Sequence, residues 1–114
     1  MRAAFYRGSR TFTIGETPVP APGPGEALLR VRRVGICGTD LHIFQGHLDH
    51  RVPMGGVIGH EVLAEVVEAP AGSGVARGDR VVFEPLWFCG TCRACAMGAS
   101  YLCYALKIIG VELP

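Results

Sequence analysis

The sequence predicts a mainly β protein: a small irregular β-barrel with short helices and a metal-binding lobe. Three observations lead to this fold class. Short apolar runs that favour strands recur along the 114 residues, sixteen glycines and eight prolines separate them, and helix signals are sparse. A chain of this length is sufficient for one domain with a single hydrophobic core.

Five runs predict strands. In "EALLRVRRV" and "HEVLAEVVE", apolar and polar positions partly alternate, as they do in strands with one buried face. "PAPGPGE" predicts a turn before the third strand and "GSGVARGDRV" a tight turn before the fifth, because proline fixes φ and glycine tolerates positive φ. The predicted strands cover residues 2–6, 11–16, 26–34, 60–68 and 80–84.

Two short helices complete the predicted elements. Thr39 or Asp40 is suited to cap a helix over residues 41–45, because each side chain can accept hydrogen bonds from free backbone amides. A second helix is predicted over residues 96–102, inside a cysteine-rich segment. The barrel is therefore expected to carry an excursion after its fifth strand.

The composition argues against several classes of protein. With 49% hydrophobic residues, 18% charged residues and a net charge of +1, the chain resembles neither a disordered segment nor a nucleic-acid binder. Its start lacks the apolar stretch of a signal peptide, and no later run is long enough to cross a bilayer. We therefore expect a soluble, cytoplasmic protein without a nucleic-acid or membrane partner.

Four of the five cysteines lie in "CGTCRACAMGASYLC". Two-residue spacings allow thiolates to converge on a tetrahedral zinc ion, and four thiolates leave no open position, which predicts a structural zinc site. In a reducing compartment such cysteines bind metal more often than they form disulfides. Two disulfides, a free-thiol cluster and an iron–sulfur cluster remain alternatives. The four residues are Cys89, Cys92, Cys95 and Cys103.

The fifth cysteine, Cys37, stands apart in "GICGTDLHIFQG". His60 and Glu61 follow a glycine-rich approach to the fourth strand, and a cysteine, a histidine and a carboxylate are typical ligands of a catalytic zinc with one open position. Taken singly, each has a plainer interpretation. Cys37 would then be a small buried hydrophobe, His60 a hydrogen-bonded structural residue and Glu61 a solvated charge.

Further polar groups surround Cys37 in the sequence. Asp40 is suited to accept a hydrogen bond from the second ring nitrogen of His60 and so fix its tautomer. Thr39 and His42 are able to accept and release a proton. The spacing in "GHLDH" is compatible with metal binding, but we interpret His47 and His50 as ordinary loop residues.

Four motifs in this order, "GICGTDLHIFQG", "GHE", "GDRV" and "CGTCRACAMGASYLC", resemble the N-terminal catalytic domain of the zinc-dependent medium-chain alcohol dehydrogenases. The resemblance covers nearly the whole chain and implies a GroES-like β-barrel. It implies that Cys37 and His60 bind the catalytic zinc and that the four clustered cysteines bind the structural zinc. In the polyol and threonine dehydrogenase branches, which "CGTDLH" and "RVVFEP" resemble most, the glutamate at the position of Glu61 also binds the catalytic zinc.

The same resemblance assigns roles to the neighbouring residues. Thr39 and His42 correspond to the proton relay, and Asp40 corresponds to the partner of the ligand histidine. The implied reaction is NAD(P)-dependent oxidation of a small-molecule alcohol or polyol, and the full-length protein is compatible with a homo-oligomer. A stand-alone zinc-stabilised binding module is the alternative function.

One departure from the family is large. Full members continue into a Rossmann domain that binds NAD(P), whereas this sequence has no G-x-G-x-x-G motif after a strand. We therefore expect residues 1–114 to be an incomplete GroES-like catalytic domain with its zinc lobe at residues 89–103, and to be a fragment of a longer enzyme. By itself this chain is expected to bind zinc but to lack activity.

Overall fold

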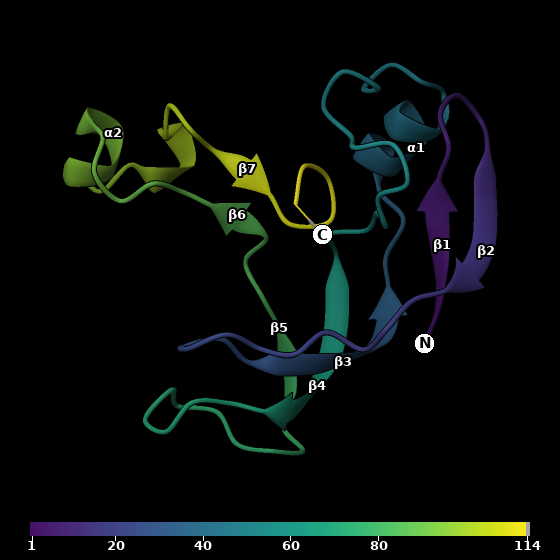
Figure 1. Cartoon of the computed structure of the whole chain (residues 1–114). Coiled ribbons are helices and arrows are strands. Elements are labelled where there is room, and N and C mark those ends of the chain that lie inside the picture. The colour runs from purple at the N-terminus through teal and green to yellow at the C-terminus, as the bar shows by residue number, and fades with distance from the viewer. Residues whose placement is uncertain (114) are drawn as a thin grey trace.

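The computed structural model describes residues 1–113, which form short strands around one well-formed helix (Figure 1). The molecule measures 41 × 36 × 22 Å along its principal axes. In chain order the elements are β1 (Arg2–Tyr6), β2 (Phe12–Glu16), β3 (Leu28–Val34), α1 (Gly38–Phe44), β4 (Val62–Glu68), β5 (Arg80–Val82), β6 (Leu86–Trp87), α2 (Arg93–Ala96), η1 (Ser100–Leu102) and β7 (Lys107–Ile108).

The mainly β class is confirmed, and β1 to β5 lie where the five predicted strands were expected. The sequence analysis did not predict β6 and β7, because a two-residue strand has no readable alternation. Over residues 1–113 the strands form three separate antiparallel sheets, β1–β2, β3–β4–β5 and β6–β7. The predicted barrel is therefore not closed in this part of the chain, since closure requires every strand edge to pair.

Both predicted helices need correction. The N-cap of α1 is Cys37, whereas Thr39 lies inside the helix and Asp40 completes a capping box from the third helical position. The predicted helix over residues 96–102 is divided into α2 and η1. Gly98, with φ at +78°, lies between these two short elements and turns the chain in a conformation that a continuous helix excludes.

The hydrophobic core lies where the β1–β2 hairpin, α1 and the C-terminal turn meet. Tyr6 from β1 and Ile43 from α1 are fully buried, and Val52 and Val111 from two loops pack with them. Burying a large apolar side chain contributes roughly 1.5–3 kcal/mol relative to leaving it exposed. This small core therefore fixes α1, which carries the first candidate metal ligand at its N-terminus.

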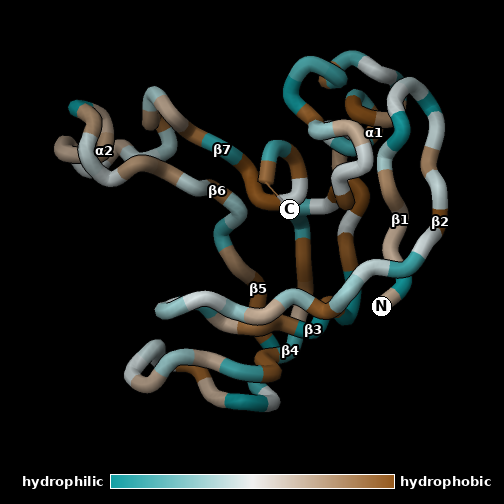
Figure 2. The backbone as a smooth tube through the Cα atoms, in the orientation of Figure 1, coloured by the Kyte–Doolittle hydropathy of each residue, from teal (hydrophilic) through white to brown (hydrophobic). Residues whose placement is uncertain are grey.

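The strand β4 is the central strand of the three-stranded sheet and is largely hydrophobic (Figure 2). Its buried residues Val62, Ala64 and Val66 alternate with more exposed ones, as the period of a strand requires. The other side of the sheet remains open, and Leu63 of β4 and its partner Val82 of β5 are exposed there. Among the described residues, no helix is long and apolar enough to span a membrane.

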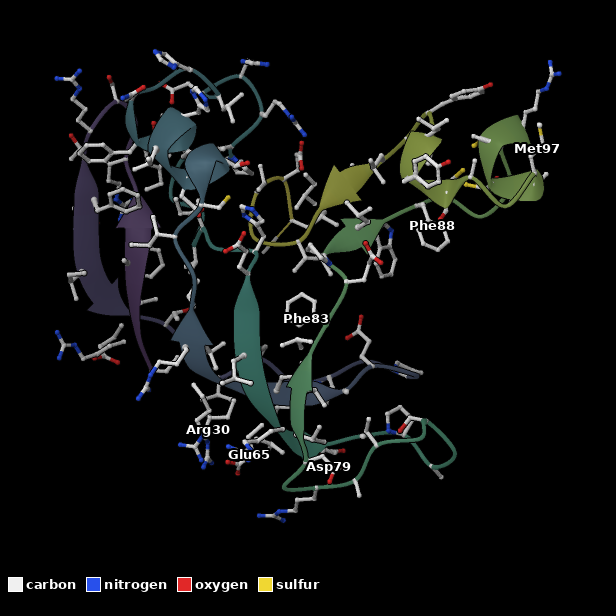
Figure 3. All side chains as sticks on the ribbon, turned by 180° about the vertical axis from the view of Figure 1, so that it is seen from behind. Arg30, Glu65, Asp79, Phe83, Phe88 and Met97 are labelled. Carbon is white, nitrogen blue, oxygen red and sulfur yellow. The ribbon has the colours of Figure 1, made fainter. Side chains whose placement is uncertain are left out.

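The cysteine-rich lobe lies at the end of an arm formed by β6 and β7, on the side opposite β1 and β2 (Figure 1). Figure 3 shows Phe88 and Met97 at this lobe. In the same view, Arg30 and Glu65 lie side by side at the end of the three-stranded sheet that is away from α1. The two candidate metal centres are therefore in different parts of the molecule.

Candidate metal centres

Cys37 is fixed by the start of α1. Its backbone is extended, its Sγ accepts a hydrogen bond from the amide of Thr39 at 3.3 Å, and its own amide donates to Asp40 Oδ2 at 2.9 Å. The capping box therefore positions a candidate ligand with residues of a single segment.

His60 is positioned by a close contact between two glycines. The Gly59 amide donates to the carbonyl of Gly110 at 3.0 Å, and a Cβ added to Gly110 would lie 2.0 Å from the Gly59 oxygen. One residue after His60, the carbonyl of Glu61 accepts a hydrogen bond from the Gly35 amide at 2.8 Å. The second contact holds the beginning of β4 beside Gly35, which follows β3 and lies two residues before Cys37.

The structure brings together Cys37, His60 and Glu61, the three residues that were predicted to bind the catalytic zinc. One ligand atom from each residue lies within 4.8 Å of the others, and Cys37 Sγ is 3.1 Å from His60 Nε2. Cys37 and His60 are half-buried, whereas Glu61 is exposed. The three donors thus converge from two segments that are 23 residues apart in the chain.

Asp40 faces the other side of the same imidazole. Its Oδ1 lies 3.7 Å from His60 Nδ1, which is longer than a hydrogen bond, and both atoms are buried without a hydrogen-bond partner among the described residues. Buried polar atoms are normally satisfied, so an unpaired buried pair requires an explanation. The arrangement fits a histidine that offers Nε2 to a metal ion and turns Nδ1 toward a carboxylate.

A hollow of about 610 Å³ opens beside these donors. His60 and Glu61 line it together with Arg33 and with apolar side chains that include Leu63 and Phe83. Figure 3 shows Phe83 beside β4, between the three-stranded sheet and the arm. A mostly apolar hollow with a few polar groups at one end is typical of a small-molecule site.

Thr39 and His42 both lie on α1, three positions apart, and therefore on one face of the helix. Over residues 1–113 the structure shows no hydrogen bond between their side chains. Instead, His42 Nδ1 lies 3.2 Å from Nδ1 of His47. The sequence by itself does not indicate this histidine pair, because His47 follows the pattern of an ordinary loop residue.

The second candidate centre contains the four clustered cysteines. Their sulfur atoms all lie within 4.8 Å of one another, and the four residues are free thiols, not disulfides. The Cys89–Cys103 and Cys92–Cys95 sulfur pairs are each separated by 3.5 Å. This distance excludes a disulfide bond and leaves the sulfurs close enough to share one ion.

Backbone amides surround this cluster of thiols. Hydrogen bonds from the amides of Thr91 and Cys92 lower the pKa of the Cys89 thiol to about 6. Desolvation and the neighbouring thiol of Cys92 raise the pKa of Cys95 to about 12. Thiols this close compete for negative charge, and a bound divalent cation removes that competition. The donor set therefore fits a closed, structural zinc site.

Comparison with known proteins is consistent with this geometry. The model of the "Alcohol dehydrogenase GroES-like domain" family matches residues 23–111. The chain is 42% identical to 2-dehydro-3-deoxy-L-galactonate 5-dehydrogenase of Pseudoalteromonas atlantica over 115 residues, which cover 100% of this chain and 34% of that protein. It is 44% identical over 100 residues to L-threonine 3-dehydrogenase of Pyrococcus horikoshii, with 85% of this chain and 29% of that protein covered.

A solved structure gives the same result. The thermostable alcohol dehydrogenase of Pyrobaculum aerophilum, determined with cobalt and zinc bound, superposes with a TM-score of 0.84 at 36% identity. The match covers 99% of this chain and 36% of that one. The chain thus spans about a third of the length of the curated relatives it matches. Because the family model covers most of the chain, the protein belongs to the alcohol dehydrogenase GroES-like domain family.

Proposed function

We propose that this chain is the zinc-binding catalytic domain of an NAD(P)-dependent alcohol or polyol dehydrogenase. The observation that supports this most strongly is the convergence of Cys37, His60 and Glu61 beside an open hollow. A metal ion with a purely structural role does not require a coordination side that is open to substrate. The four-thiol cluster already provides a closed metal site elsewhere in the chain. Two separate donor sets, one closed and one open, favour one structural and one catalytic zinc.

Cys37, His60 and Glu61 would hold the catalytic zinc. When bound there, zinc supplies Lewis-acid chemistry that polarises a substrate hydroxyl and lowers its pKa. Asp40 orients the imidazole of His60 from the opposite side, and the capping box of α1 keeps Cys37 in place. The apolar wall of the hollow offers a surface beside these donors for the carbon skeleton of a substrate.

Thr39 and His42 are proposed to receive the proton of the alcohol. Thr39 is half-buried near Cys37, and His42 lies exposed on the same helix face one turn later. A hydroxyl that both accepts and donates is suited to transfer a proton to an imidazole at the surface. This path leads from the interior toward solvent along α1.

Oxidation of an alcohol also requires a hydride acceptor. Zinc has no redox chemistry, and the described residues include no group that accepts a hydride. NAD(P), bound by a further domain, fills this role in our proposal. We further propose a cytoplasmic location, because five free cysteines suit a reducing compartment.

The relatives suggest the class of substrate. Their names describe dehydrogenases that act on a sugar acid and on an amino acid with a hydroxyl group. We propose a small polyhydroxylated or hydroxylated substrate for this chain, with oxidation at a secondary hydroxyl. Homo-oligomerisation of a full-length protein is part of the same proposal.

Zinc content of the purified chain tests the proposal. We expect two zinc ions per chain, and one in a Cys37→Ser variant, because the four-thiol cluster remains intact in that variant. Glu61→Gln is expected to weaken retention of the same ion, whereas the matched control Glu68→Gln, at the far end of β4, retains both. One zinc ion in both the wild type and Cys37→Ser would contradict a catalytic metal centre in this chain.

A further inference from the structure

The end of α1 places two histidines next to each other. Gly46 has φ at +83°, its amide donates to the carbonyl of Ile43 at 2.8 Å, and the amide of His47 donates to the carbonyl of His42 at 3.0 Å. This pair of hydrogen bonds is the Schellman motif, in which a left-handed glycine ends a helix. The motif brings together the side chains of His42, the third-last helical residue, and of His47, the residue after the glycine.

In most helices an apolar contact occupies this place, whereas here both side chains are imidazoles. His42 Nδ1 and His47 Nδ1 are 3.2 Å apart, and the ring centroids are separated by 5.5 Å at an interplanar angle of 40°. Both residues are exposed. The same nitrogen of each ring therefore lies close to that of the other, at a place that solvent and small ions can reach.

We infer that His42 and His47 form a third metal site, a two-histidine chelate for a divalent transition-metal ion. Two nitrogens bound at about 2.0–2.1 Å to one tetrahedral ion lie about 3.3 Å apart, close to the distance found here. Imidazole nitrogen suits zinc, nickel and copper, whereas calcium and magnesium prefer oxygen ligands. Water completes the coordination of an ion held by only two side chains.

The backbone provides the rigidity that makes two ligands sufficient. Each histidine is fixed through its own main-chain group, because the His47 amide bonds to the His42 carbonyl. Less conformational entropy is therefore lost when an ion binds than for two histidines on a free loop. Asp49 is the acidic residue of this loop, but we do not include it among the ligands, because its carboxylate accepts a hydrogen bond from Tyr6.

This site is distinct from the two centres described above. Neither histidine belongs to the group of Cys37, His60 and Glu61 or to the four-thiol cluster. With two ligands and an exposed position, it holds an exchangeable ion, not a structural one. If the proposed function is correct, an ion on His42 Nδ1 occupies the lone pair that would receive the substrate proton, so that the ion inhibits the enzyme.

Nickel binding to the purified chain, with its two expected zinc ions in place and free zinc removed, tests the inference. We expect calorimetry to show one saturable Ni²⁺ ion per chain, and binding weakened by about tenfold or more in His42→Gln and in His47→Gln. His50→Gln is the matched control, since His50 lies exposed on the same loop, and this variant should bind Ni²⁺ as the wild type does. Zinc measured in the same samples shows whether Ni²⁺ has displaced it from the cysteines.

Nuclear magnetic resonance provides a second readout that does not depend on affinity. Paramagnetic Ni²⁺ should broaden the imidazole signals of His42 and His47 first and leave those of His50 sharp. Absence of saturable binding, or equal binding in His47→Gln, would overturn the inference and leave only a hydrogen bond between the two rings. Loss of the Cys37 zinc centre would not affect these results. Failure of the proposed function is therefore distinguishable from failure of the two-histidine site.

Discussion

Tyr6 joins the hydrophobic core to the loop that follows α1. It is fully buried, its hydroxyl donates to Asp49 Oδ1 at 2.5 Å, and the same hydroxyl oxygen lies 2.7 Å from the carbonyl oxygen of Ile43. Burial, together with the hydrogen bond to Asp49, raises the pKa of Tyr6 to about 12 from its ordinary value of 10.0. The folded chain therefore requires a neutral phenol at this position.

The sign of this shift predicts alkaline instability. Because the pKa is higher in the folded chain than in the unfolded chain, the stabilisation is complete below pH 10 and is lost as pH rises from about 10 to about 12. We expect urea denaturation to show a free energy of unfolding that falls across this range. Tyr6→Phe should lower stability by about 1–2 kcal/mol at pH 8 and flatten the alkaline fall. An equally steep fall in Tyr6→Phe would refute the assignment.

At the scale of elements, the beginning of β4 depends on the turn after β7. Gly110 is buried with φ at +79°, and the space that a Cβ would need is filled by the backbone of Gly59. Arg51 and Glu112 form an ion pair beside this turn and link it to the loop after α1. The position of His60 is therefore determined by backbone packing between Gly59 and Gly110, which lie far apart in the chain.

Gly110→Ala is expected to displace His60. The added methyl group cannot avoid the Gly59 carbonyl, so the two backbones must separate. We expect zinc content to fall from two ions to one, because the Cys37 centre loses its geometry while the four-thiol cluster is unaffected.

Gly72→Ala is the matched control for this variant. Gly72 has nearly the same φ, +78°, but nothing lies within 4 Å of its added Cβ. The Gly72→Ala variant should lose about 1–2 kcal/mol of folding stability from backbone strain and retain both zinc ions. Retention of both ions by Gly110→Ala would show that the glycine contact does not position His60.

At the scale of the whole molecule, the core and the lobe have different sources of stability. The core buries Tyr6, Ile43, Val52 and Val111 together, whereas Cys103 is the one buried residue among positions 89–103, all of which are described. A lobe without apolar burial depends on its four thiols and the ion we propose they hold. The arm formed by β6 and β7 keeps the lobe away from the core (Figure 1).

Removal of metal should therefore affect the lobe alone. After chelation, confirmed by elemental analysis, we expect the amides of residues 89–103 to lose their protection from hydrogen exchange. The amides of Tyr6 and Ile43 should keep theirs, because that core contains no metal ligand. Cys37→Ser with its lobe zinc retained serves as the control, and a protected lobe in the zinc-free chain would contradict the prediction.

The amino-acid sequence by itself determined the local features. Alternation and turn residues predicted the five longer strands, because these signals lie within a few neighbouring residues. The two-residue spacings of Cys89, Cys92 and Cys95 indicated the four-thiol cluster for the same reason. The residue types also suggested that Cys37 and His60 share a zinc ion, and the resemblance to the alcohol dehydrogenases supported that pairing, which no local spacing contains.

The tertiary structure decided what depends on distant contacts. Over residues 1–113 it arranged the strands of the expected irregular barrel as three separate sheets, and it made Cys37 the cap of α1 in place of Thr39 or Asp40. It also brought His42 and His47 together. The sequence carries the signal for that pair in Gly46, but whether a glycine adopts positive φ and ends a helix depends on packing around it. Local patterns therefore determine elements and ligands, whereas packing between elements determines which side chains meet.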